Sequence, residues 1–226
     1  MAADFQAMSA AMSSANRLRD FIGNQSAVKI LRRAIKQDRL PHAMLFAGPA
    51  GIGKCTLALL VAQYLNCLSP EDNDACGNCH ACRRILAVNE SRSLVCKKEG
   101  EFCGNCPACH VRMKCHPDIH LVEPEKTKIG IKQIQSLIKE IAFQPLEARY
   151  RAAILDPADN MSMEAQNCLL KTLEEPPSRT VIILITTTPH LLLETIRSRS
   201  RLLQFGEMPQ ELIAQRLVLG RGMPDD

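Results

Sequence analysis

The apolar positions of the chain alternate between two spacings. Helical spacing occurs at 56–65, 131–141 and 164–175, and the last of these segments is followed by Pro176 and Pro177, which cannot continue a helix. Short apolar runs typical of buried strands occupy 43–47, 118–123, 151–156, 181–186 and 201–205. Alternating strands and helices predict an α/β fold with a mainly parallel sheet flanked by helices.

Three regions fall outside this alternation. Residues 67–115 are polar, rich in cysteine and too long for a plain loop, so we expect an insertion with its own source of order. Residues 1–16 are weakly patterned and read as an N-terminal extension. Residues 208–226 contain one short helical pattern, which we interpret as the start of a helical lid domain. The main domain is then expected at 17–207.

Composition narrows the class of protein. The chain has 226 residues, of which 46% are hydrophobic, enough for a real core. Its net charge of +4 permits contact with nucleic acid but falls short of the basic footprint of a dedicated DNA reader. There is no run of about 18 apolar residues and no apolar signal core. We therefore expect a cytoplasmic protein with no membrane contact.

The cysteines predict zinc. Most of the eleven fall in CxxC pairs, which favours metal thiolates in a reducing compartment. A first set has the spacing of a closed, structural tetrahedral site and comprises Cys67, Cys76, Cys79 and Cys82. CGNCHAC at 76–82 returns as CGNCPAC at 103–109, which gives a second set, Cys96, Cys103, Cys106 and Cys109. Two zinc ions are expected; the alternative is one ion shared between the sets.

A glycine-rich segment, GPAGIGKCT at 48–56, predicts a phosphate site. Gly48, Gly51 and Gly53 allow the backbone to curl around phosphates, Lys54 reaches the β and γ oxygens, and the following helix adds its positive end. The alternative is an ordinary glycine-rich turn. The site would take ATP with Mg²⁺.

Two departures from the usual pattern weaken the expected chemistry. Cys55 occupies the position of the hydroxyl that coordinates Mg²⁺, and a thiol is a poor ligand for that hard cation; Thr56 comes one position too late, although it could meet a phosphate. Asp156 ends a strand as a metal-side carboxylate should, but Pro157 follows it and cannot polarise water. Asp159 lies beyond the strand and is not expected to substitute. We therefore expect slow or absent hydrolysis.

Five segments in order carry a resemblance. Together they resemble the AAA+ clamp-loader ATPases of bacterial DNA polymerase III. The segments are GPAGIGK, the ILD strand, NCLLKTLEEPP at 167–177, TTTP at 186–189 and IRSRSRLLQF at 196–205. HPDIHLVEPE at 116–125 and the residues after it are more similar to the delta prime branch of that family than to the gamma/tau branch. The resemblance extends from Arg17 onward.

The resemblance implies roles for particular residues. Thr187 or Thr188 matches the family's sensor residue, which contacts the terminal phosphate. Arg17 and segments 21–25 and 41–42 match the part of the family that closes over adenine. Arg199, in a Ser-Arg-Ser triplet that stands for the family's Ser-Arg-Cys, matches an arginine that serves the ATP site of the neighbouring subunit in trans. The family also has a zinc module at the place of the first cysteine set.

The implied function is that of a clamp-loader subunit, with gamma/tau and delta subunits, a sliding clamp and primed DNA as partners. Such a subunit would bind ATP weakly or not at all, and without the family's C-terminal collar it would be a monomer in isolation. One alternative is a self-sufficient AAA+ ATPase that remodels DNA. Another is a zinc-finger nucleic-acid binder, which the single aromatic residue between the cysteine sets does not favour.

Overall fold

The strands form one parallel sheet. The computed structural model describes residues 17–91, 116–125 and 127–207, so the predicted extension at 1–16, the predicted lid at 208–226 and the second cysteine set lie outside the described residues. The described strands pair in the order β2-β3-β4-β1-β5, and every pair is parallel. Their bounds are β1 Ala43–Ala47, β2 Ile119–Val122, β3 Arg151–Leu155, β4 Thr180–Thr186 and β5 Arg201–Gln204. All five predicted strands are confirmed.

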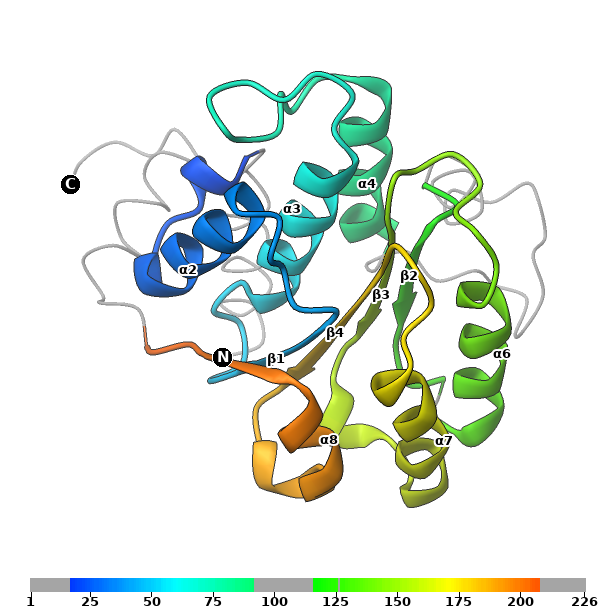
Figure 1. The fold of residues 1–226 in the computed structure, drawn as a ribbon. Coiled ribbons are helices and arrows are strands. Elements are labelled where there is room, and N and C mark those ends of the chain that lie inside the picture. Colours follow the sequence, from blue (N-terminus) through cyan, green and yellow to red (C-terminus); the bar gives the residue numbers. More distant parts are fainter. Residues whose placement is uncertain (1–16, 92–115, 126, 208–226) are drawn as a thin grey trace.

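Helices cover both faces of the sheet (Figure 1). One face carries α2 (Gln25–Lys36), α3 (Lys54–Asn66) and α4 (His80–Ser91), and the other carries α6 (Ile131–Ile141), α7 (Met163–Glu174) and α8 (Glu194–Arg199). Short 3-10 turns are η1 (Leu18–Asp20), η2 (Ala158–Asn160) and η3 (Pro189–Leu191). The predicted helices α3, α6 and α7 are confirmed, whereas α2, α4 and α8 were not predicted. No helix among the described residues is long and apolar enough to cross a membrane.

The central strands are buried on both faces. In β1, Met44 and Phe46 pack with α2 and α3, while Ala43 and Leu45 pack toward α6, α7 and α8. The same division holds along β3 and β4, whose residues are all buried. Burial on both faces explains why these strands are continuous apolar runs in the sequence rather than alternating ones.

The common strand direction gives the sheet two chemically different edges. We call the edge where the strands end the carboxyl edge and the edge where they begin the amino edge. β1 and β5 run side by side from the pair Met44–Arg201 to the pair Ala47–Gln204. The segment after β1 is therefore at the carboxyl edge, whereas the residues before β5 are at the amino edge.

A buried ion pair fixes the connection between α6 and β3. Asp118 is fully buried, and one carboxylate oxygen lies 2.9 Å from Arg151 Nη2. The carboxylate also accepts the backbone N–H groups of Leu146, Glu147 and Ala148 at 2.8–2.9 Å. Burial would raise the pKa of Asp118, but these N–H donors and the Arg151 guanidinium outweigh burial and lower the pKa to about 2.

Replacing Asp118 by Asn should destabilise the fold strongly. The change leaves the buried Arg151 guanidinium without its counter-charge, which costs about 3–5 kcal/mol in free energy of unfolding, measurable by urea denaturation. Glu147→Gln is the control, because the Glu147 side chain is about half exposed in its ion pair with Arg84 and should cost less than about 1 kcal/mol.

The same carboxylate predicts a pH dependence. The pKa of Asp118 is lower in the folded chain than its ordinary value of 3.8. Its contribution to stability is therefore present at neutral pH and is lost as the pH falls from about 4 toward 2. Urea denaturation at pH values from 7 down to 2 measures this loss, and an Asp118→Asn variant that loses as much stability over that range as the unmodified chain would contradict the assignment.

Candidate phosphate site and cysteine cluster

The glycine-rich loop joins β1 to α3 at the carboxyl edge. Gly51 and Gly53 have φ of 77° and 87°, in the left-handed region that favours glycine. Gly48 is required for a different reason: a Cβ there would lie 2.5 Å from the backbone oxygen of Phe205 and 2.8 Å from its Cβ. The loop thus passes directly against the residue that follows β5, and a side chain at Gly48 would push the two segments apart.

Lys54 lies inside this loop. Only 6% of the residue is exposed, and its Nζ donates to the carbonyl oxygens of Gly48 at 2.7 Å and Pro49 at 2.5 Å. Burial lowers the pKa of Lys54, while the carboxylates of Asp156 and Asp159 act in the opposite direction. Both aspartates are therefore close enough for their charge to act on the ammonium group.

Asp159 belongs to the site more closely than the sequence indicated. It was not expected to replace the water-activating acid, and the structure places it in η2, which directly follows Pro157. One carboxylate oxygen of Asp159 accepts the Thr187 hydroxyl at 3.3 Å. Its other oxygen is buried without a hydrogen-bond partner among the described residues. Thr187 also lies 3.1 Å from the Thr188 hydroxyl, so both candidate sensor threonines are beside the site.

The residues expected to bind Mg²⁺ are less suited to that ion than the loop is to phosphate. Cys55 is buried in the first turn of α3 and offers sulfur where Mg²⁺ prefers oxygen, and Thr56 is half-buried one position later. Asp156 directly follows β3, with Pro157 next in the chain. The residues therefore fit the phosphate part of a nucleotide, whereas they fit a tightly held Mg²⁺ poorly.

The two segments expected near adenine separate in the structure. Asn24 Oδ1 accepts the backbone N–H of Gly206 at 2.7 Å, which brings segment 21–25 to the carboxyl edge near the loop. His42, by contrast, directly precedes β1, and its Nε2 lies 3.2 Å from the carbonyl oxygen of Leu173. The expectation for 41–42 was wrong, because these residues lie at the amino edge.

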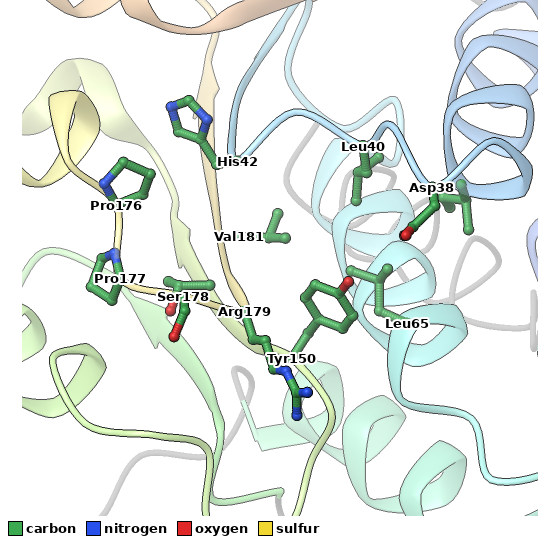
Figure 2. A pocket seen from close by; sticks show the side chains of 12 residues that line it. Asp38, Leu40, His42, Leu65, Tyr150, Pro176, Pro177, Ser178, Arg179 and Val181 are labelled. Atoms are coloured by element: carbon green, nitrogen blue, oxygen red, sulfur yellow. The ribbon is translucent and has the colours of Figure 1, made fainter.

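A pocket of about 380 Å³ lies at that same amino edge, as Figure 2 shows. Its walls include residues that directly precede strands: His42 before β1, Tyr150 before β3 and Arg179 before β4. Ligands of open parallel sheets bind outside the carboxyl ends of the strands. The pocket is therefore separate from the phosphate site.

The first cysteine set comes together as one cluster. The sulfur atoms of Cys67, Cys76, Cys79 and Cys82 all lie within 4.8 Å of one another. The sulfur atoms of Cys76 and Cys82 are 3.9 Å apart, close to the roughly 3.8 Å that bonds of about 2.3 Å in a tetrahedron require. The donor set and its spacing fit Zn²⁺, and four thiolates leave no ligand position for catalysis.

Backbone N–H groups are directed at the sulfur atoms of this cluster and favour their thiolate form. N–H groups of Cys76 and Cys79 point to the sulfur atoms of Cys67 and Cys76, at 3.2 and 3.3 Å. Burial raises the pKa of the Cys67 and Cys82 thiols. At Cys79 burial is outweighed by the N–H groups of Leu68 and Cys82 and by neighbouring thiols, which lower the pKa to about 6. Metal binding would therefore release protons from the Cys67 and Cys82 thiols.

The cluster is also tied to the main body of the chain. Cys67 directly follows the last residue of α3, and α4 begins directly after Cys79. The fully buried Asp74 between them accepts the N–H groups of Leu18 and Arg19 in η1, at 3.2 and 2.7 Å. The predicted insertion thus contains a helix and anchors the start of the described chain.

Arg199 lies at the other edge of the sheet. It is the last residue of α8, two residues before β5, and its side chain is 37% exposed. Nη2 lies 2.7 Å from Oε1 of Glu174, and Nη1 donates to the carbonyl oxygen of Thr195 at 3.2 Å. The length of β5, roughly 13 Å at about 3.3 Å per residue, separates Arg199 from the phosphate loop of its own chain.

This sheet order and the glycine loop between β1 and α3 define an AAA+ P-loop fold. The Thermotoga maritima RuvB Holliday junction branch migration motor matches 92% of this chain and 54% of its own, with a TM-score of 0.55 and 16% identity. A DNA polymerase III gamma subunit-related protein from the same organism matches 81% of this chain and 46% of its own, with a TM-score of 0.53 and 22% identity. These likenesses concern the fold.

The sequence places the chain more narrowly. It belongs to the family described as "DNA polymerase III, delta subunit", which matches residues 23–91 and 85–209. DNA polymerase III subunit delta' of Bacillus subtilis is 37% identical over 191 residues, 84% of this chain and 50% of the relative. Subunit delta' of Pseudomonas aeruginosa is 35% identical over 160 residues, 70% of this chain and 41% of the relative. The chain spans half or less of the length of these relatives.

Replacing Cys67 by Ser should remove one zinc ion per chain. Loss of one thiolate opens a four-ligand shell that has no substitute among the described residues, and metal content is measured on purified protein by elemental analysis. Cys168→Ser is the control, because Cys168 is a free, half-buried cysteine of α7. Unchanged zinc in the Cys67 variant would refute the site.

Proposed function

We propose that this chain is a delta prime-like subunit of a bacterial DNA polymerase III clamp loader that completes the ATP site of a neighbouring subunit. One observation carries the proposal: the phosphate loop and the exposed Arg199 lie at opposite edges of one sheet. A cation so placed cannot act on nucleotide in its own loop. It can act on nucleotide held by a subunit that packs against the amino edge.

The residues at the chain's own phosphate loop are poorly suited to ATP hydrolysis, which supports a role for this chain at the neighbouring subunit's site. Cys55 and Pro157 replace the metal-binding hydroxyl and the water-activating acid. Asp159 is not proposed to restore the acid, since one of its carboxylate oxygens already accepts a hydrogen bond from the Thr187 hydroxyl. We therefore propose that ATP is bound weakly or not at all and that hydrolysis is slow or absent.

Arg199 then supplies a guanidinium group to the ATP site of the neighbouring subunit. A guanidinium delivered across an interface stabilises charge on the transferring phosphoryl group and contributes about 10³–10⁵ in rate at that site. We place gamma/tau and delta subunits, a sliding clamp and primed DNA among the partners, in the cytoplasm. We propose one zinc ion for each cysteine set, and the ion of the first set would hold the segment from Cys67 to Cys82 beside α3. The family and the delta' relatives support this proposal at the level of a clamp-loader subunit.

A self-sufficient AAA+ ATPase that remodels DNA is the competing function. The fold likeness to a branch migration motor is compatible with it. Such a motor would hydrolyse ATP without partners, which the residues at 55 and 157 do not favour.

Arg199→Ala should lower DNA-stimulated ATP hydrolysis by the assembled loader at least tenfold. An arginine finger contributes about 10³–10⁵ in rate at the site it serves, so a tenfold loss is expected when turnover of the assembled loader depends on that site. The control is Arg197→Ala, on the same helix, also exposed and without an ion pair to any described residue. Steady-state phosphate release measures both variants.

Equal rates for the Arg199 and Arg197 variants would contradict the proposal. The purified subunit alone is assayed beside them with saturating Mg²⁺ and DNA. Turnover comparable to that of the assembled loader would favour the competing motor, and negligible turnover is the expected result.

A further inference from the structure

Arg199 is held in place by contacts from two helices. Glu174, the last residue of α7, lies 2.7 Å from Nη2 of Arg199. Thr195, one turn earlier on α8, accepts Nη1 through its backbone carbonyl at 3.2 Å. The guanidinium is therefore fixed by a carboxylate on one helix and a carbonyl on another, rather than projecting freely from the surface.

These contacts leave most of the guanidinium available. An arginine side chain has five N–H donors in a planar fork, and the two contacts engage one donor on each terminal nitrogen. About a third of the side chain is open to solvent. The remaining donors can meet an acceptor that arrives from outside the chain.

We propose that Glu174 is a positioning residue for Arg199, which orients the guanidinium at the amino edge toward the terminal phosphate of ATP bound by the neighbouring subunit. This inference rests on the proposed function. A long arginine side chain loses much rotamer freedom when it engages a phosphate. Glu174 restricts the rotamers of Arg199 before the subunits meet, so less side-chain entropy is lost when Arg199 engages the phosphate at the transition state.

The place of Glu174 in the sequence supports a dedicated role. It is followed by Glu175, Pro176 and Pro177, and the prolines end the helix, so that the side chain stands at its last position. Both partners are exposed, with 49% of the Glu174 side chain accessible. An exposed ion pair adds little to the stability of a fold. Its measurable effect is therefore on the orientation of Arg199.

The test compares Glu174→Ala and Glu174→Gln with Glu175→Ala in the assembled loader. Glu175 is the adjacent exposed glutamate and has no ion pair with a described residue. Glu174→Ala should lower kcat for DNA-stimulated hydrolysis about two- to fivefold, the range expected for an exposed pair, with KM and the unfolding temperature unchanged. Glu174→Gln should recover part of kcat, because its carbonyl oxygen still accepts an N–H. Glu175→Ala should match the unmodified protein.

A second comparison uses the Arg199→Ala background. There, Glu174→Ala should have no further effect, because a positioning residue acts only through the group it positions. A further fall in that background would overturn the inference, as would a higher kcat for Glu174→Ala alone. If Arg199→Ala lowers kcat but Glu174→Ala matches Glu175→Ala, the inference fails and the proposed function stands. If Arg199→Ala itself has no effect, both fail.

Discussion

The parallel direction of the strands is the constraint on which the rest of this structure depends. Because every described strand runs the same way, everything that follows a strand gathers at one edge and everything that precedes a strand gathers at the other. Lys54, Asp156 and Thr187 follow β1, β3 and β4 and therefore lie at the carboxyl edge with the glycine loop. Arg199 precedes β5 and lies with Glu174 at the opposite edge. One sheet thus carries an anion-binding end and a separate cationic group.

Contacts outside the sheet keep these two ends in a fixed relation. The close approach of Gly48 to Phe205 joins the phosphate loop to the end of β5, whose other end begins beside Arg199. The Asp118–Arg151 pair holds the connection between α6 and β3. The cysteine cluster fixes the end of α3, and Asp74 within it holds η1.

Much of this could be predicted from the sequence, and the failures have physical causes. Strands buried on both faces are unbroken apolar runs, so all five were found within about one residue at each end. α4 was missed because it lies within a cysteine-rich segment whose order was assigned to metal alone. The error at 41–42 was avoidable, since residues before β1 must lie at the edge opposite the loop that follows it. The contact of Asp159 with Thr187 could not be predicted, because a 3-10 turn after a strand leaves little signal in the sequence.

The first cysteine set was found because CxxC spacing carries its own geometry, whereas the partners of Asp118 and Arg199 are distant in sequence and become visible only in the fold. A structure of the assembled loader bound to a non-hydrolysable ATP analogue tests the role of Arg199 most directly. In that structure the Nη atoms of Arg199 should lie within about 3 Å of terminal phosphate oxygens in the neighbouring subunit. Arg199 facing solvent at that interface, or reaching nucleotide in its own chain, would contradict it.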